Sequence, residues 1–444
     1  MIEDSLKYSS IWKLTYPVML GLLAQNLINF TDTVFLGWVG EVELGASAIG
    51  GLFYYGVFVV GFGFSLGAQI LISRRNGEKN YAEIGKIFNH SLMFLMILGL
   101  IIVAFVQTSA PGLLRKTLSS TAVFEATWDF LDIRIWGIFF AFINVNFRAF
   151  YVGIMKTHFL IWSAVIMAVV NIILNYLLIF GNFGFPRMGI AGSALASVIA
   201  EAFSVLFFVV LTLRKRRLDS YGILKPGRFS WSVIGSTLGL SVWTMIQNFL
   251  AMGGWLFFFM IIERSGEHPL AISNIARSIY IMLMIPLWAF GTTTNTLVSN
   301  LIGERKQHLV VKALKRISLM SIITTFVITA PAAFFPHSLL SLYTSDLILI
   351  NDTVPVLYVV FGALIVFSGV TTVYSGVTGT GNTLMGMLIE VITIFAYVVF
   401  AYIVVIEFHQ PVKIAFLSEF VYFIIMGSLS FMYLRYGNWR KIKI

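Results

Sequence analysis

Long apolar runs separated by short polar stretches dominate the chain, and this pattern is typical of a protein folded in a bilayer. Each run approaches or exceeds the roughly 20 residues that a helix needs to cross the hydrocarbon core. About twelve can be read, near residues 14–36, 46–73, 88–110, 128–154, 159–181, 190–213, 233–262, 270–301, 316–336, 352–377, 385–407 and 412–435. The pattern predicts an all-α polytopic membrane protein, and the second and eighth runs are long enough to predict tilted or kinked helices.

Composition agrees with this pattern. Of the 444 residues, 58% are hydrophobic and 11% are charged, whereas soluble domains average about 25% charged residues. The chain has no cysteine, which excludes disulfides and thiolate metal sites. Its first residues, "MIEDSLKYSSIWKL", are not typical of a removed signal peptide, so we expect the first apolar run to be retained as a span.

The basic residues orient the predicted helices. With the N-terminus placed in the cytoplasm, 23 Lys and Arg residues fall on the inside and 5 on the outside. This bias follows the positive-inside rule and predicts that both termini are cytoplasmic. The net charge of +10 is then a topology signal lying against an anionic leaflet, not a signal for binding nucleic acid.

Similar segments recur in the two halves of the chain. "LLAQNLINF" at 22–30 resembles "TMIQNFLAM" at 244–252 with a spacing of 222, and "SRRNGEK" at 73–79 resembles "SNLIGER" at 299–305 with a spacing of 226. "AFYVGI" at 149–154 resembles "TVYSGV" at 372–377. We therefore predict a duplicated six-helix unit, with an N-lobe at 1–213, a cytoplasmic linker at 214–230 and a C-lobe at 231–444. An even number of helices gives both copies the same orientation, which predicts a pseudo-twofold axis along the membrane normal.

Ionisable residues inside predicted spans are functional candidates, because each costs at least about 2.5 to 3.5 kcal/mol on insertion scales. Asp32, Glu201 and Glu390 lie well inside, while Asp129, Asp132 and Arg134 lie near an outer end, where we expect local pairing. A rise of about 1.5 Å per residue places four polar residues in the outer half of the N-lobe, roughly 8 to 15 Å below its surface. These four are Asp32, Asn171, Asn175 and Ser197.

One carboxylate among amide and hydroxyl oxygens suits a small cation. Na⁺ prefers oxygen ligands, and a carboxylate withdrawn from water can take a proton. We therefore expect H⁺ or Na⁺ to couple at Asp32, Asn171, Asn175, Ser197 and Glu201, with Asp32 and Asn171 as metal ligands only if Na⁺ is the ion. At a spacing of 222, the C-lobe residue equivalent to Asp32 is Gly254, which has no carboxylate. We therefore expect the cation to couple in the N-lobe.

Other polar residues are candidates for a substrate cavity. Gln25 and Asn29 share a helical face with Asp32, and the remaining candidates are Gln247, Asn274, Arg277 and Glu390. The 41 Phe, 17 Tyr and 17 Met residues mostly suit lipid contact and interfacial belts. Some can line a cavity that repacks against varied organic cations.

Several motifs, in order, resemble the multidrug and toxic compound extrusion (MATE) family over essentially the whole chain. They are "NFTDTVFLGWVG" on the first helix, "FRAFYVGIMKT" on the fourth, "NIILNYLLIFG" followed by "MGIAGSALAS", and "GNT" after the tenth. The resemblance implies a V-shaped pair of six-helix bundles that export cationic, amphipathic compounds in exchange for Na⁺ or H⁺.

The family's site residues carry over in part. The resemblance implies that the first-helix aspartate is Asp32, the fifth-helix asparagine is Asn171 and a sixth-helix hydroxyl is Ser197. One branch of the family often has a second aspartate where this chain has Asn175. The other branch has acidic residues on the seventh and tenth helices, where this chain has Ala251 and a residue near Ser368.

One alternative to an antiporter stays open. A flippase of a related superfamily, carrying lipid-linked oligosaccharides or precursors, is expected to have a strongly cationic cavity, whereas only Arg134 and Arg277 lie within the predicted spans. An enzyme is not expected, because the chain has no HExxH zinc motif and no nucleotide-binding loop. We expect a monomer in a bacterial inner membrane, with no cofactor beyond the coupling ion.

Overall fold

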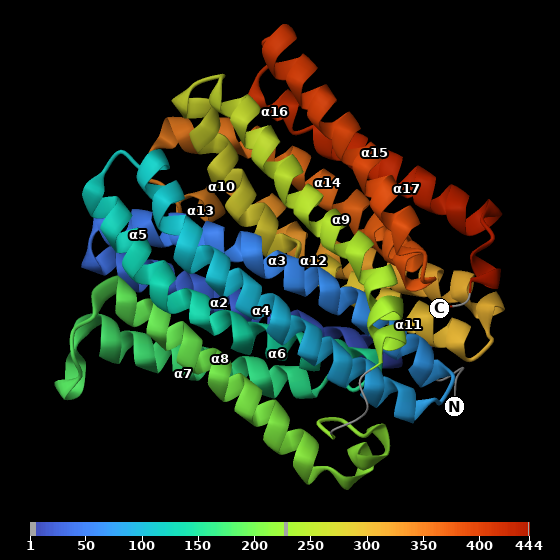
Figure 1. Cartoon of the computed structure of the whole chain (residues 1–444). Helices are drawn as coiled ribbons and strands as arrows, with labels where there is room; N and C mark the ends of the chain where they lie inside the picture. The colour runs from blue at the N-terminus through green and yellow to red at the C-terminus, as the bar shows by residue number, and fades with distance from the viewer. Residues whose placement is uncertain (1–5, 226–229, 443) are drawn as a thin grey trace. The chain divides into compact units, whose positions relative to one another are not determined.

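The computed structural model describes residues 6–225, 230–442 and 444. Within these residues the chain is helical and contains no strand (Figure 1). The α-helices are α2 (Tyr8–Val39), α3 (Glu41–Gly77), α4 (Tyr81–Thr117), α5 (Thr121–Arg134), α6 (Ile138–Gly153), α7 (Phe159–Phe180), α8 (Gly189–Arg214), α9 (Trp231–Glu263), α10 (Glu267–Leu283), α11 (Ile285–Gly303), α12 (Val310–Phe334), α13 (Pro336–Leu340), α14 (Leu347–Gly379), α15 (Thr383–Tyr402), α16 (Val412–Ala415) and α17 (Ser418–Tyr436).

The number of spans agrees with the predicted fold class. In the described part of the chain, 11 helical segments are long and apolar enough to cross a membrane, or 12 if α10 and α11 form one bent span. These two helices meet at an angle of 43° beside Pro286, whose ring removes a backbone donor. The kink predicted for the eighth apolar run is therefore confirmed. A short 3₁₀ turn, Ile135–Gly137, joins α5 to α6 within the fourth span.

By contacts the chain divides into two units. The N-unit comprises Leu20–Met245, and the C-unit comprises Met1–Met19 together with Ile246–Ile444. Helices α2 and α9 are thus each shared between the units. The predicted lobe boundaries differ from these units at residues 1–19 and 231–245. The lobes describe the duplicated sequence, and their boundaries stay a prediction. Residues 226–229 of the predicted linker, with Arg228, lie outside the described residues, as do residues 1–5 and Lys443.

The shared helices make similar contacts in the two units. In the C-unit, the Thr15 hydroxyl donates to Thr293 Oγ1 at 3.0 Å. In the N-unit, the Ser241 hydroxyl donates to the carbonyl of Phe64 at 2.9 Å, and a Cβ on Gly67 would lie 2.6 Å from the Ser241 Cα. Thr15 and Ser241 are 226 residues apart, as are Gly67 and Thr293. The same helix crossing therefore recurs.

Backbone geometry repeats at the same spacing. Lys79 and Arg305 both have φ of 59°, and Met155 and Gly381 have φ of 59° and 93°. Each pair is 226 residues apart. These are left-handed turns that follow equivalent helices, and such positions are uncommon for residues other than glycine.

Glycine contacts show the repeat within each unit. A Cβ on Gly153 would lie 2.6 Å from Ile72 and 3.4 Å from the Gln69 carbonyl oxygen. The equivalent Cβ on Gly379 would lie 3.1 Å from Val298 and 2.7 Å from the Asn295 carbonyl oxygen. All three pairs are again 226 residues apart.

The spacings of 222 and 223 read from the sequence are therefore shifted by about one helical turn relative to these contacts. At a spacing of 226, the residue equivalent to Asp32 is Phe258, not Gly254. Phe258 is 2% exposed and stacks on Tyr397 with ring centroids 5.4 Å apart. The absence of a carboxylate at this position of the C-unit is unchanged.

The described part of the linker packs against α4. Asn89 donates to the carbonyls of Gly222 and Lys225 at 3.2 and 3.1 Å and accepts from the Leu224 amide at 2.9 Å. Next to it, His90 Nε2 accepts from the Ser230 amide at 2.9 Å. Two consecutive side chains thus hold both ends of this connection within the N-unit.

Candidate functional site

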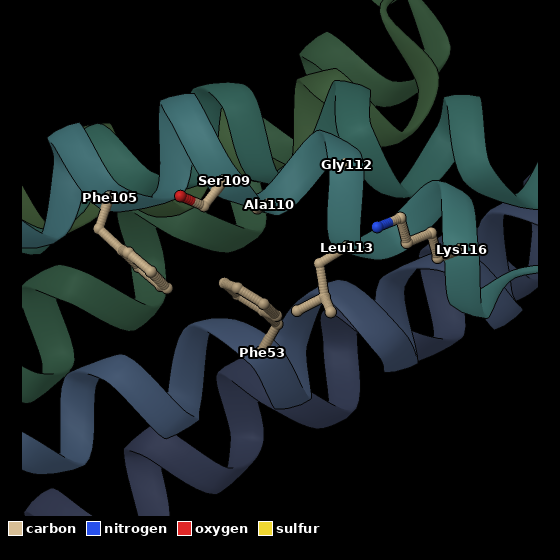
Figure 2. A pocket seen from close by; sticks show the side chains of 7 residues that line it. All are labelled: Phe53, Phe105, Ser109, Ala110, Gly112, Leu113 and Lys116. Carbon is tan, nitrogen blue, oxygen red and sulfur yellow. The ribbon is translucent and has the colours of Figure 1, made fainter.

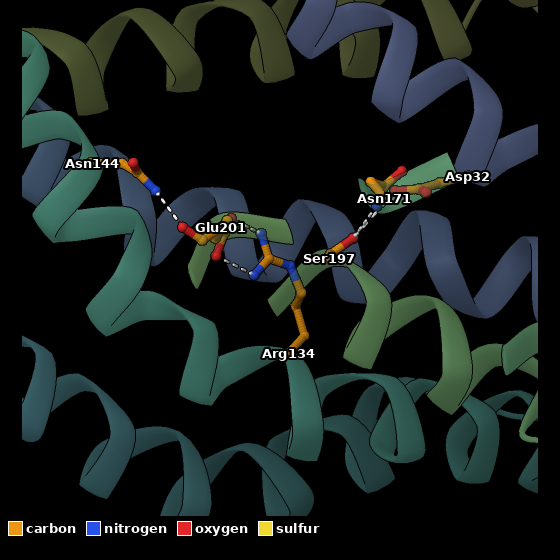
Figure 3. A network of polar contacts seen from close by, with 6 residues as sticks. All are labelled: Asp32, Arg134, Asn144, Asn171, Ser197 and Glu201. Carbon is orange, nitrogen blue, oxygen red and sulfur yellow. Dashed lines mark hydrogen bonds and ion pairs between the residues drawn. The ribbon is translucent and has the colours of Figure 1, made fainter. Parts of the chain in front are cut away.

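Asp32 lies at the centre of a polar network in the N-unit. Its carboxylate accepts a hydrogen bond from Asn175 Nδ2 and makes a longer contact of 3.5 Å with the Ser197 hydroxyl. Asn175 also donates to Asn171 Oδ1 at 3.0 Å, and Asn171 donates to Ser197 Oγ at 3.1 Å. The structure therefore brings together the four residues that the sequence places at one depth. Figure 3 shows three of them, Asp32, Asn171 and Ser197.

Close packing of α7 on α8 positions this network. Asn171 and Asn175 are one turn apart on the same face of α7, and both are fully buried. On α8, a Cβ at Gly192 would lie 2.7 Å from the Leu178 carbonyl. Gly181 ends α7 in the left-handed region with φ of 76°, which any other residue would adopt with strain. Small residues thus let α8 approach closely enough for Ser197 to reach Asn171.

Asn175 carries a buried atom without a partner. Its Nδ2 donates twice, whereas its Oδ1 is buried and has no hydrogen-bond partner. A buried amide oxygen in this state costs roughly 1 to 3 kcal/mol. The network therefore holds an unused acceptor beside a carboxylate, a second amide and a hydroxyl.

Glu201 lies one turn beyond Ser197 on α8, but an arginine already pairs with it. Arg134 Nη1 and Nη2 donate to its two carboxylate oxygens at 3.0 and 2.6 Å. The Arg134 guanidinium also lies 3.8 Å from the ring centroid of Tyr54. The expectation that Arg134 pairs locally with Asp129 or Asp132 is wrong, because the partner of Arg134 comes from another helix. The charge of Glu201 is compensated, and neither of its oxygens is left free.

Hydroxyl and amide groups extend this ion pair along α8. Asn144 Nδ2 donates to the Glu201 carbonyl at 3.1 Å and its Oδ1 accepts from Ser204 at 2.7 Å. Ser204 lies 2.6 Å from Ser163 Oγ. Asn144, Ser163 and Ser204 are further members of the network that the sequence analysis did not select. The signal that could have selected them is that each is a polar residue within an apolar predicted span.

The predicted substrate-cavity residues are divided between the units. Gln25 and Asn29 are exposed on α2 in the N-unit. In the C-unit, Asn274 is exposed and accepts from Arg277 at 3.3 Å, and Arg277 also lies 4.6 Å from the ring centroid of Phe259. Gln247 is half-buried and its Oε1 has no partner. Their role stays a prediction.

Glu390 lies in a closed part of the C-unit instead of on an open face. It is 3% exposed and accepts a hydrogen bond from Tyr422. A second carboxylate, Glu419, is 5% exposed and accepts from Tyr280 at 2.8 Å and Tyr397 at 3.3 Å. The sequence analysis missed Glu419, although a carboxylate within the predicted span 412–435 was visible.

A hollow of about 400 Å³ lies in the N-unit between α3 and α4, and no residue of the Asp32 network lines it (Figure 2). Phe53, Phe105 and Leu113 supply most of its apolar lining, and Lys116 stands at one end. Its walls offer one hydroxyl, from Ser109, as a specific polar contact. This composition suits an acyl chain or packing lipid better than a cation.

Metal binding and serine hydrolysis have no support in the described part of the chain. Among the described residues, no group of three or more His, Cys, Asp or Glu side chains could hold a metal ion. Residues 63–67, Gly-Phe-Ser-Leu-Gly, match the GxSxG pattern of serine hydrolases. They lie inside the continuous helix α3, and Ser65 donates to the carbonyl of Phe62 at 2.7 Å. The strand-to-helix turn that exposes a nucleophile is therefore missing at this position.

The fold and the network define a class: a multi-pass membrane protein of repeated helical units with a half-buried carboxylate in a polar network. The sequence profile of the MatE family matches residues 17–177 and 244–403. The chain therefore belongs to the MatE family of multidrug and toxic compound extrusion proteins, as the motifs suggested.

Similar proteins agree with this assignment. A probable multidrug resistance protein NorM from Thermotoga maritima is 25% identical over 440 residues, covering 97% of this chain and 92% of that protein. A protein of the same name from Xylella fastidiosa is 26% identical, covering 86% and 81%. Among solved structures, a MOP superfamily transporter from Pyrococcus furiosus has a TM-score of 0.88 at 19% identity, covering 96% and 94%. A MATE structure in complex with MaL6 has a TM-score of 0.89, covering 96% and 95%. The structures share the fold.

Proposed function

We propose that the protein is a secondary antiporter that exports cationic, amphipathic organic compounds in exchange for H⁺ or Na⁺. The coupling ion binds in the N-unit around Asp32. Membership of the MatE family and relatives named as probable multidrug resistance proteins support export of drugs. The observation that carries the coupling site is the contact of Asp32 with Asn175 and Ser197.

The network can respond to a cation through one amide. In the present arrangement, Asn175 turns its donor toward the Asp32 carboxylate and leaves Oδ1 without a partner. A half-turn of this amide exchanges its donor and acceptor. Oδ1 then faces Asp32, where it can accept from the protonated acid or ligate Na⁺ together with Ser197. Cation binding would thus release the Asn175 donor both from Asp32 and from Asn171 Oδ1, to which the same Nδ2 donates.

Coupling requires that the cation and the drug favour different states of the transporter. A ligand shifts an equilibrium only by its difference in affinity for the two states. A cation that neutralises Asp32 changes the bonds between α2, α7 and α8, so its affinity depends on how these helices are arranged. The drug then favours the opposite state, and alternation between the states exchanges one for the other.

The arginines within spans do not favour the flippase alternative. Arg134 is neutralised by Glu201, and Arg277 contacts Asn274 and the ring of Phe259. Arg134 is therefore compensated, and Arg277 by itself does not make the strongly cationic cavity expected for a lipid-linked diphosphate. We further propose a monomer in a bacterial inner membrane with both termini in the cytoplasm, acting without a cofactor other than the coupling ion.

Transport into and out of proteoliposomes tests the proposal. The purified chain would be reconstituted, Na⁺ and pH gradients imposed separately, and the efflux of a panel of cationic, amphipathic dyes followed by fluorescence. We expect efflux under one of the two gradients and loss of that gradient dependence in Asp32→Asn. Asp132→Asn is the matched control, because Asp132 bonds to Gln107 outside the network. Undiminished, gradient-driven efflux by Asp32→Asn contradicts coupling at this residue.

A further inference from the structure

The C-unit contains a closed cluster of two carboxylates and four tyrosines. Glu419 accepts from Tyr280 and Tyr397, and Glu390 accepts from Tyr422. A fourth tyrosine, Tyr374, lies beside Glu390. The rings of Tyr397 and Tyr422 meet edge to face at 5.8 Å and join the two parts. We call these six residues the tyrosine cluster.

The tyrosine cluster has no basic partner among the described residues. Its members come from α10, α14, α15 and α17. The other charged or imidazole groups on these helices and on the segment between α15 and α17 are exposed or bonded elsewhere: Glu267, His268, Arg277, Asp352, Glu407, His409, Lys413 and Arg435. On α12, which packs against α14, Lys312 and Lys315 are exposed and Arg316 donates to the carbonyl of Leu6. The cluster thus differs from the N-unit, where Arg134 compensates Glu201.

An unpaired buried carboxylate favours its neutral form. Removing an ionised carboxylate from water is costly unless a cation compensates it, and the group usually takes up a proton instead. Hydroxyl donors reduce this cost without adding a positive charge. A proton is also the ligand that fits, because Tyr280, Tyr397 and both carboxylates are at most 5% exposed and no organic cation has room among them.

The two carboxylates differ in their surroundings. Glu419 lies in the first turn of α17 and accepts from two tyrosines, and a helix N-terminus stabilises a negative charge. Glu390 lies inside α15 without such a dipole. Beside it, Tyr374 donates to the carbonyl of Gly386 at 3.1 Å, so its oxygen remains able to accept from an acid. Glu390 is therefore the better place for a proton.

From this arrangement we propose that the C-unit binds a proton at Glu390, with Glu419 as the anion that Tyr280 and Tyr397 stabilise. When Glu390 is neutral, its acid hydrogen can donate to Tyr374, and the bond from Tyr422 weakens. Occupancy thus changes how α17 is attached to α15. The site is separate from Asp32 and would allow a second proton to take part in the transport cycle.

The repeat supports a ligand site at this place. At a spacing of 226, Tyr397 is equivalent to Asn171 and Tyr280 is equivalent to Tyr54. Asn171 on α7 bonds to Ser197 on α8, and its equivalent Tyr397 on α15 bonds to Glu419 on α17. In each unit this residue thus links the fifth span to the sixth. The tyrosine cluster therefore occupies the part of the C-unit that corresponds to the Asp32 network.

Infrared difference spectroscopy between acidic and alkaline pH tests this site without a substrate. The full chain would be measured in lipid nanodiscs in choline chloride, so that Na⁺ is absent. We expect protonated-carboxyl bands that titrate, with one band lost in Glu390→Gln and a different one lost in Asp32→Asn. The C-unit site and the Asp32 site can thus fail independently. Glu407→Gln, an exposed glutamate beyond α15, is the matched control and should leave both bands unchanged.

Tyr422→Phe provides a test that keeps both carboxylates. Removing this donor should shift the Glu390 band to higher frequency and leave the Asp32 band in place. If Glu390→Gln is folded and shows the same bands as the wild type, or if Tyr422→Phe shifts none, the proposal is overturned. A band that disappears only when NaCl replaces choline chloride would overturn it in favour of a sodium site.

Discussion

The N-unit and the C-unit both hold carboxylates between their helices, at different positions of the repeat, and stabilise them differently. In the N-unit, Glu201 has a guanidinium partner and Asp32 has amide and hydroxyl partners. In the C-unit, Glu390 and Glu419 have tyrosine hydroxyls. A duplicated scaffold thus tolerates charge in two ways, by pairing it with a cation or by surrounding it with donors that leave room for a proton.

The largest expected difference between the units is in stability. Glu201→Gln leaves Arg134 buried without an anion and should cost roughly 3 to 5 kcal/mol of unfolding free energy. Glu419→Gln leaves only two tyrosine hydroxyls with a poorer acceptor and should cost about 1 to 2 kcal/mol. Chemical unfolding in mixed micelles would measure both. The double variant Arg134→Gln/Glu201→Gln should recover part of the loss, and equal costs for the two single variants would contradict the contrast.

A smaller effect is expected on ion affinity. Asn175→Asp places a second carboxylate one turn from Asn171 and beside Asp32, and carboxylates raise the affinity of an oxygen site for a hard cation. We expect Na⁺ to bind at least about tenfold more tightly, equal to about 1.4 kcal/mol. Calorimetric titration with NaCl against a choline chloride control would measure this affinity. Ala401→Asp, the equivalent change in the C-unit, should produce no Na⁺ binding, and a similar gain there would show that the units are not distinct.

The smallest expected effect is a gain in stability at two turns that are equivalent in the two units. Lys79 and Arg305 occupy equivalent turns in the left-handed region, where residues with a Cβ are strained. Lys79→Gly and Arg305→Gly should each raise the unfolding free energy by up to about 1 kcal/mol. Thermal unfolding of the two variants would measure the gain. A gain in one variant and a loss in the other would show that the turns are not equivalent.

Much of the fold could be predicted because the bilayer imposes one requirement on every span. Runs of about 20 apolar residues mark helices whatever their neighbours are. The rise along a helix then places Asp32, Asn171, Asn175 and Ser197 at one depth, and the structure brings them into contact. Their role in coupling stays a prediction.

Pairing between helices and the register of the repeat could not be predicted. Glu201 and Arg134 are 67 residues apart in sequence, and nothing in their own helices indicates that they meet. The spacing of 222 misplaced the repeat because a shift of four residues is nearly one helical turn and keeps the same face aligned. Glu419 was missed although the rule that selected Asp32 applied equally to it.

Sharing α2 and α9 between the units has a consequence for how the molecule can be dissected. Residues 6–19 belong by contact to the C-unit, and residues 230–245 belong to the N-unit. A cut in the linker therefore yields two polypeptides, each lacking a helix segment that its own unit needs and carrying one that the other unit needs. Neither half contains a complete unit. Co-expressed halves should therefore assemble by exchanging these helix segments, as the two chains of a domain-swapped dimer do.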